Sequence, residues 1–178
     1  MKKIALMFGA LLMFGMTQGF FAQELEAVEQ PEAVEEEVVK PVADARIKAA
    51  LDRQQIDYEI DEDGDFRVIF TTDDDGDRTQ LVFVNSNVEK YGEKLEIREI
   101  WSLGYRNDGS VPPALVKKAA KMSRDYVVGA WEVIGDNRLA LVAKVPANLD
   151  DDTLLGTIGS IGRKADAFEK DTLGTDDL

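Results

Sequence analysis

Short stretches in which apolar residues recur at alternate positions fill the middle of the chain. Residues 57–60 (DYEI), 66–71 (FRVIFT), 79–86 (TQLVFVNS) and 95–101 (LEIREIW) are rich in the β-branched and aromatic residues that favour strands. Clusters of Gly, Asp and Asn separate them, and two clusters contain Asp followed by Gly, at 63–64 and 75–76. That dipeptide is typical of tight hairpin turns, so these stretches predict an antiparallel meander of four strands.

Three other segments have the spacing of helices, at 44–55, 110–125 and 150–170. A second hairpin is predicted at 127–134 and 139–145, in which Trp131 and Val133 lie opposite Leu139 and Leu141. The last helix has a continuous apolar stripe of Leu154, Ile158, Ile161, Ala165 and Phe168, with Gly156, Gly159 and Gly162 between them. These glycines permit either a close backbone approach or fraying. The order α-β-β-β-β-α-β-β-α predicts an α+β fold, an antiparallel sheet with three helices mainly on one face.

The alternation also assigns side chains to the two faces of the sheet. Phe66, Val68 and Phe70 on one strand, with Leu81 and Phe83 on the next, are expected to form the core face. The opposite parity is apolar as well, at Ile69, Val82, Val84 and Ile100. We expect these four residues to bind a partner, because monomers seldom expose such a patch. The alternative is that the helix at 150–170 covers this face from within the same chain.

One strand breaks its own alternation. In 95–101 the residues Leu95, Ile97, Glu99 and Trp101 share a parity, but Ile100 is apolar too. We expect a β-bulge near Glu99, with a buried functional carboxylate as the alternative.

The N-terminus predicts export. Two Lys precede an apolar run at 4–16, the layout of a bacterial secretory signal peptide, which we assign to residues 1–22 and which implies a periplasmic or secreted location. An uncleaved membrane anchor is the alternative. Residues 23–43 carry seven Glu and two Pro and predict a disordered acidic spacer, or else an acidic interaction arm. The globular domain is then 44–172, followed by an acidic tail at 173–178.

Composition limits the chemistry. The 178 residues carry a formal charge of −14, which disfavours binding to nucleic acid or to an anionic membrane surface. The chain contains no Cys and no His, so the commonest nucleophile–base pairs and zinc ligands are missing. We therefore expect a protein that is not an enzyme and has no cofactor.

The acidic turns at 61–65 and 73–77 resemble calcium loops only superficially. Aligning each Gly with the sixth position of a calcium loop puts Phe70 and Val82 at the twelfth, where a bidentate Glu is required. We interpret both turns as solvated hairpin turns and expect no metal site.

Several segments together resemble the YbjN domain. These are YEIDEDGDF at 58–66, LVFVNS at 81–86, EIREIWS at 96–102, the helix opening with Pro112 and Pro113, and AWEVIGD at 130–136 before VAKVPA at 142–147. The YbjN family is often described as sensory transduction regulators, with a fold similar to the type III secretion chaperones. The resemblance covers about 44–172 and implies a non-enzymatic, often dimeric module that binds protein segments.

The sequence therefore predicts an exported protein-binding or chaperone-like module of YbjN type. Its expected partner is a protein or peptide, and a homodimer is one form that such binding takes. The competing hypothesis is an acidic structural or weakly calcium-responsive envelope protein.

Overall fold

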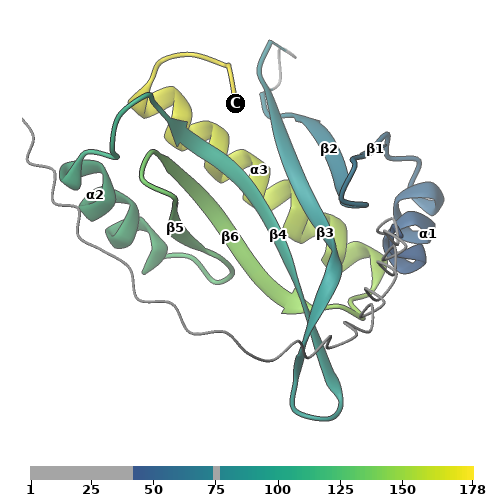
Figure 1. Cartoon of the computed structure of the whole chain (residues 1–178). Helices are drawn as coiled ribbons and strands as arrows, with labels where there is room; N and C mark the ends of the chain where they lie inside the picture. The colour runs from purple at the N-terminus through teal and green to yellow at the C-terminus, as the bar shows by residue number, and fades with distance from the viewer. Residues whose placement is uncertain (1–41, 74–76) are drawn as a thin grey trace, which may run out of the picture. The chain divides into compact units, whose positions relative to one another are not determined.

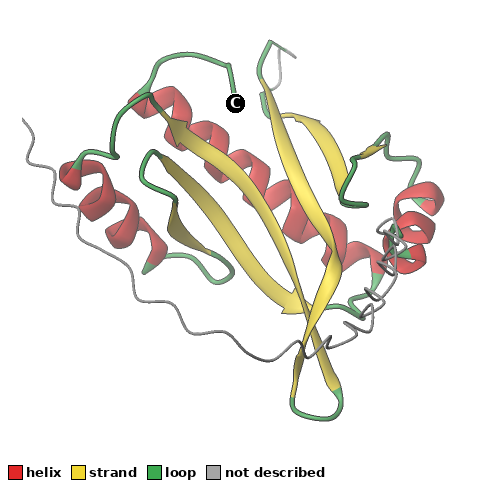
Figure 2. Ribbon diagram, in the orientation of Figure 1, coloured by secondary structure: helices red, strands yellow, loops and turns green. Residues whose placement is uncertain are grey.

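The computed structural model describes residues 42–73 and 77–178. Within them the helices are α1 (Ala45–Arg53), α2 (Pro113–Ser123) and α3 (Asp151–Thr172), and the strands are β1 (Glu59–Ile60), β2 (Phe66–Thr71), β3 (Thr79–Tyr91), β4 (Leu95–Arg106), β5 (Ala130–Ile134) and β6 (Arg138–Pro146). This order confirms the predicted α+β fold (Figure 2). The predicted signal peptide at 1–22, and the predicted spacer as far as residue 41, lie outside the described residues.

The strands form one antiparallel sheet in the order β1-β2-β3-β4-β6-β5 (Figure 1). The first four are the predicted meander. The predicted hairpin of β5 and β6 joins the sheet through β6, which pairs with β4. Trp131 pairs with Leu141 and Val133 with Leu139, as the alternation predicted.

The central strands β3 and β4 are longer than their apolar patterns. We predicted strands at 79–86 and 95–101, but β3 continues to Tyr91 and β4 to Arg106. The hairpin between them closes in a turn at Gly92, whose φ is +69°. Residues 87–91 are mostly polar, so the apolar alternation could not reveal this part of β3. β5, in contrast, begins only at Ala130, because Gly129 has a φ of +87° and interrupts the extended backbone before it.

Helix α3 crosses one face of the sheet behind β3, β4 and β6 (Figure 1). All five residues of its predicted apolar stripe are buried. A Cβ added at Gly162 would lie 3.0 Å from Cγ2 of Val82. Glycine at this position therefore permits a close approach of helix and sheet, one of the two roles predicted for it.

The other two helices join the same core. Apolar residues of α1 belong to one buried cluster with those of α3, and Arg53 of α1 forms an ion pair with Asp151 at the start of α3. In α2, Ala119 is buried in that cluster and Lys118 forms an ion pair with Asp171 of α3. No helix among the described residues crosses the opposite face of the sheet.

The irregularity predicted near Glu99 is present, but its extra residues belong to the neighbouring strand. Val84 pairs with Ile100 and Val88 with Arg98, so residues 85–87 of β3 face Glu99 alone. The Glu99 side chain itself is only half-buried and lies on the face away from α3. β4 therefore alternates regularly here, with Ile100 in the core.

Candidate functional site

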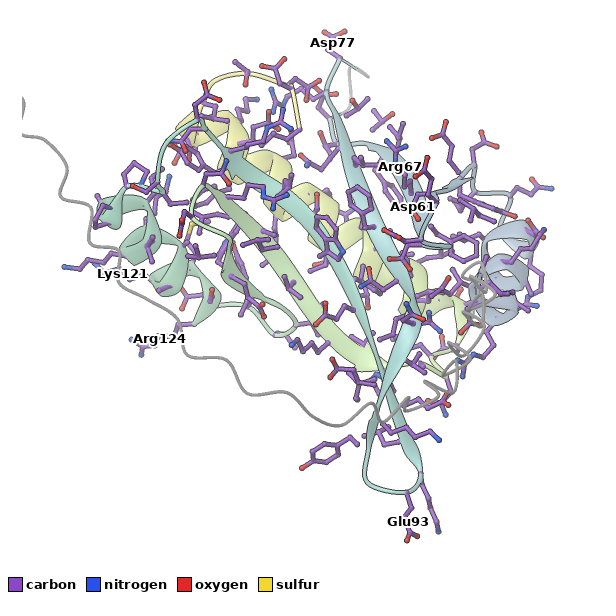
Figure 3. The ribbon with its side chains drawn as sticks, in the orientation of Figure 1. Asp61, Arg67, Asp77, Glu93, Lys121 and Arg124 are labelled. Atoms are coloured by element: carbon purple, nitrogen blue, oxygen red, sulfur yellow. The ribbon has the colours of Figure 1, made fainter. Side chains whose placement is uncertain are left out.

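The face of the sheet opposite α3 carries apolar side chains across its four central strands. We call this surface the open face and define it by Ile69, Leu81, Phe83, Trp101, Leu103 and Val142. The strand register brings these residues together, because Ile69 pairs with Leu81, Phe83 with Trp101, and Trp101 in turn with Val142. Figure 3 views the sheet from this side, with side chains standing out from the strands toward the viewer.

An aromatic pair occupies the middle of the open face. The rings of Phe83 and Trp101 stack with centroids 4.2 Å apart and planes within 9° of parallel. The indole Nε1 of Trp101 donates a hydrogen bond to Oδ1 of Asn85 at 3.0 Å, and the guanidinium of Arg67, labelled in Figure 3, lies 6.0 Å from the Phe83 ring. Contacts with Asn85 and Arg67 hold the two half-buried rings in place. A ring has few rotatable bonds, so it loses little conformational entropy on binding.

Two cations on this face are paired with carboxylates. The Lys144 ammonium lies 3.1 Å from the Glu99 carboxylate, and this hydrogen bond raises the pKa of Lys144. Arg67 forms a further ion pair with Glu59 at the edge of the sheet. Glu132 and Glu89 also raise the pKa of Lys144, so further carboxylates lie near this pair.

Of the four residues that we predicted to bind a partner, only Ile69 is on the open face. Its exposed fraction is 65%, whereas Val82, Val84 and Ile100 are each 0% exposed and lie under α3. The face assignment of β3 and β4 was therefore wrong, and Leu81 and Phe83, assigned to the core, are on the open face. The alternative, in which the last helix covers Val82, Val84 and Ile100, is the arrangement observed.

The error has a specific cause. Val68 pairs with Val82, and Ile69 with Leu81. Residues paired across a strand point to the same side, so Val82 shares the core face with Val68. Both parities of β3 are apolar, and its alternation therefore fits either register.

A buried arginine, which the sequence analysis missed, organises the junction of α1 with the sheet. Arg98 is 2% exposed and donates hydrogen bonds to the carbonyl of Asn85 and to the carboxylate of Asp44. The main chain at Asn85 and Ser86 has left the regular ladder at the bulge, so the guanidinium satisfies carbonyls that would otherwise be unpaired. An Arg within a strand pattern is normally taken as solvent-exposed, which hid this role.

Asp44 joins this network as the N-cap of α1. Burial opposes ionisation of its carboxyl, but hydrogen bonds from Arg46 and Arg98 outweigh that effect and hold its pKa well below the usual range. The network is structural, because every one of these groups is engaged with another protein group.

A groove of about 440 Å³ lies beside this junction, between α1, the end of β6 and the start of α3. Its lining includes Arg46, Arg53 and Arg98, which would suit an anion. Each of them is already paired with a carboxylate, of Asp44, Glu96 or Asp151. Among the described residues, the groove therefore offers no unpaired arginine that could bind an anion.

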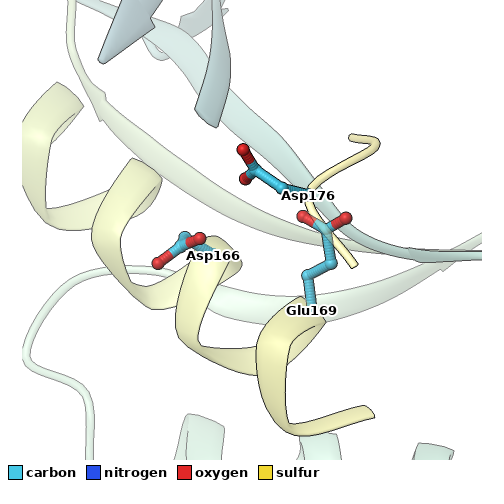
Figure 4. Close-up of side chains that lie close together, drawn as sticks. All are labelled: Asp166, Glu169 and Asp176. Carbon is cyan, nitrogen blue, oxygen red and sulfur yellow. The ribbon is translucent and has the colours of Figure 1, made fainter. Parts of the chain in front are cut away.

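Three carboxylates gather near the C-terminal end of α3 (Figure 4). Oxygens of Asp166, Glu169 and Asp176 all lie within 4.8 Å of one another. The guanidinium of Arg78 supplies positive charge, 2.6 Å from Asp166 and 3.6 Å from Asp176. Glu169 is completely buried, and its desolvation raises its pKa. Asp166 and Glu169 are buried, although both are acidic residues of a helix. The helical pattern of the sequence does not distinguish such buried acids from acids that face solvent.

The acidic turn at 61–65 uses its carboxylates internally. Oδ1 of Asp61 accepts hydrogen bonds from the main-chain N–H groups of Asp63 and Asp65, and Gly64 has a φ of +80°. This is the geometry of the predicted hairpin turn. Most of the second acidic turn, at 74–76, lies outside the described residues.

One serine and one lysine meet on α3, although the sequence offered no nucleophile motif. Nζ of Lys164 donates to Oγ of Ser160 at 2.6 Å. The same ammonium lies 4.7 Å from the centroid of the Tyr126 ring. Ser160 and Lys164 are four residues apart on one helix, so this contact is the ordinary one between side chains of successive helical turns.

Comparison with models of protein families and with curated protein sequences finds no match for this chain. The similarity to YbjN domains therefore stays a prediction. Among the residues that the structure describes, no helix has both the length and the apolar character needed to cross a membrane.

Proposed function

We propose that this chain is an exported, non-enzymatic protein-binding or chaperone-like module, and that its open face contacts the partner. The observation that carries the proposal is the placement of α1, α2 and α3 on one side of a sheet whose two faces are both apolar. One apolar face is buried by those helices, and the other is left to solvent among the described residues.

The chemistry of the open face suits protein binding. Aromatic side chains held in place by neighbours contribute disproportionately to protein–protein binding energy, and the stacked Phe83 and Trp101 are held by Asn85 and Arg67. A specific interface buries about 800 Å² on each partner, an area that the width of four strands can supply.

The partner is a protein or peptide, and a second copy of this chain is one such partner. Light scattering on the full chain separates the two cases. A monomer that captures a different protein supports a chaperone-like role, and a dimer that dissociates when the open face is mutated identifies self-association.

A charge substitution on the open face tests the proposal directly. Phe83→Glu should leave the melting temperature almost unchanged, because residue 83 can direct a carboxylate into water, and should abolish capture of the partner from extracts of the native host. Ala120→Glu on α2 is the matched control, since Ala120 is exposed on the helical side of the sheet. Equal capture by wild type and Phe83→Glu would refute the role of the open face.

A further inference from the structure

The two edges of the sheet are protected unequally. At one edge, α2 packs beside β5, and Oγ of Ser123 accepts a hydrogen bond from the main-chain N–H of Trp131 at 2.8 Å. At the other edge, β1 is only two residues long and pairs Glu59 with Arg67 and Ile60 with Phe66. Beyond that point β2 has no neighbouring strand on its outer side within the described chain.

The ladder between β2 and β3 shows which main-chain groups face outward. The N–H of Thr72 donates to the carbonyl of Arg78 at 3.0 Å, in register with the pairs 70–80 and 68–82. In an antiparallel pair such bonds recur at every second residue, so Val68 and Phe70 bond toward β3. Ile69 and Thr71 therefore direct their N–H and C=O groups away from the sheet.

The side chains here lack the usual protection of an exposed edge. Natural edges carry Lys, Pro or a bulge that prevents another strand from pairing. β2 instead presents Ile69, 65% exposed, and Thr71, also exposed, with strong β-forming character. Ile69 pairs with Leu81, so this edge continues directly into the open face.

The charge around this edge is strongly one-sided. The described residues 57–73 contain seven acidic residues and one basic residue, Arg67. Glu59 and the 61–65 turn lie at one end of β2, and Asp73 lies just past the other. A strand that pairs here and carries Lys or Arg at its ends is attracted by the acidic residues at both ends of β2, and an acidic strand is repelled.

We propose that the outer edge of β2 binds an extended protein segment with basic residues flanking a β-forming apolar centre, which adds to the sheet as a further strand. The proposal rests on the protein-binding function proposed above and names the chemistry of the partner. Main-chain hydrogen bonds at Ile69 and Thr71 supply the pairing, and the acidic clusters select basic flanks.

Amide hydrogen exchange on the full chain tests this edge residue by residue. The probe is an acetylated and amidated peptide of alternating Val and Thr with two Lys at each end, and its control replaces each Lys by Glu. The Lys peptide should slow exchange of the Ile69 and Thr71 amides by about tenfold or more, because those amides gain hydrogen bonds. The Val68 and Phe70 amides, already bonded to β3, should change little.

A proline substitution provides the second test. Thr71→Pro removes an outward N–H but none of the bonds to β3, so the fold is retained and affinity for the Lys peptide should fall about tenfold. Thr71→Val, which keeps the N–H, is the matched control. The wild-type exchange measurement remains decisive if the proline variant does not fold.

Three results would overturn the inference: unchanged exchange at Ile69 and Thr71, equal slowing by the Glu peptide, or protection of the same amides by increasing protein concentration alone, which would assign the edge to a second copy. Phe83→Glu separates this inference from the proposed function. If Phe83→Glu loses partner capture but its Ile69 and Thr71 amides are still protected by the Lys peptide, both the binding role of the open face and strand addition at β2 are supported. If capture is intact, the binding role of the open face is refuted, and the exchange measurement alone decides on the edge of β2.

Discussion

The two faces of the sheet have similar sequences and opposite surroundings. On β3, Val82 and Val84 are completely buried under α3, while Leu81 and Phe83, one residue away on the same strand, are half-exposed on the open face. Hydrophobicity alone does not distinguish them. The packing of one helix turns one apolar face into a core and leaves the other exposed to solvent, where we propose that a partner binds.

The sharpest way to test this contrast is to place the same charge on both faces of β3. Val84→Asp should unfold the domain, because an unpaired buried carboxylate costs several kcal/mol out of a total stability of about 5–15 kcal/mol. Phe83→Asp should remain folded. Urea unfolding followed by circular dichroism measures both, and a folded Val84→Asp monomer would contradict the assignment of the covered face.

Breaking an ion pair should destabilise the protein more on the covered face than on the open face. Arg98→Met leaves Asp44 and the bulge carbonyls without their partner in a buried site, and should destabilise the fold by about 3–5 kcal/mol. Lys144→Met removes the partner of Glu99 on the open face and should cause no measurable change, because that pair is exposed to water. Comparable losses for the two variants would argue against a buried role for Arg98.

A smaller effect on stability is expected from substituting Glu169, an acid buried on the covered face. The pKa of Glu169 is raised by burial, so the folded state holds this proton more tightly than the unfolded chain does. Its contribution to stability is complete below the unfolded pKa, near 4.5, and is lost as the pH rises through the folded pKa. Glu169→Gln should therefore stabilise the protein at pH 7 by about 1 kcal/mol and flatten the decline above pH 4.5. Thermal melts between pH 4 and 8 test this. A Glu169→Gln variant that is less stable than wild type at pH 7 would show that the fold needs the ionised carboxylate, as it would if the three carboxylates held a metal ion.

The element order could be read from the sequence because each element has its own local signals. Asp44 caps α1 and Asp150 caps α3 by accepting main-chain hydrogen bonds, and the apolar stripe of α3 has the spacing of a single helix face. The face of β3 could not be read in this way, since it depends on its register with β2. A shift of β3 by one residue along β2 would exchange the two faces.

The sequence predicted that a candidate binding surface exists but not which residues form it. An apolar surface on a second sheet face was expected and is present, but three of the four residues named for it are in the core. Arg98 was missed for the opposite reason, because a charged residue in a strand suggests exposure and its buried partners come from α1 and from the bulge in β3. Those contacts join residues that are distant in the sequence, and no local pattern encodes them.

Site-specific photo-crosslinking tests the central claim, that the open face is the binding surface, most directly. A benzophenone amino acid replaces Leu81 on the open face or, as control, Ala120 on the exposed side of α2, in the full chain expressed in its native host. The account predicts a discrete crosslinked protein partner from position 81 and none from position 120. The same adduct from position 120, with none from position 81, would contradict it.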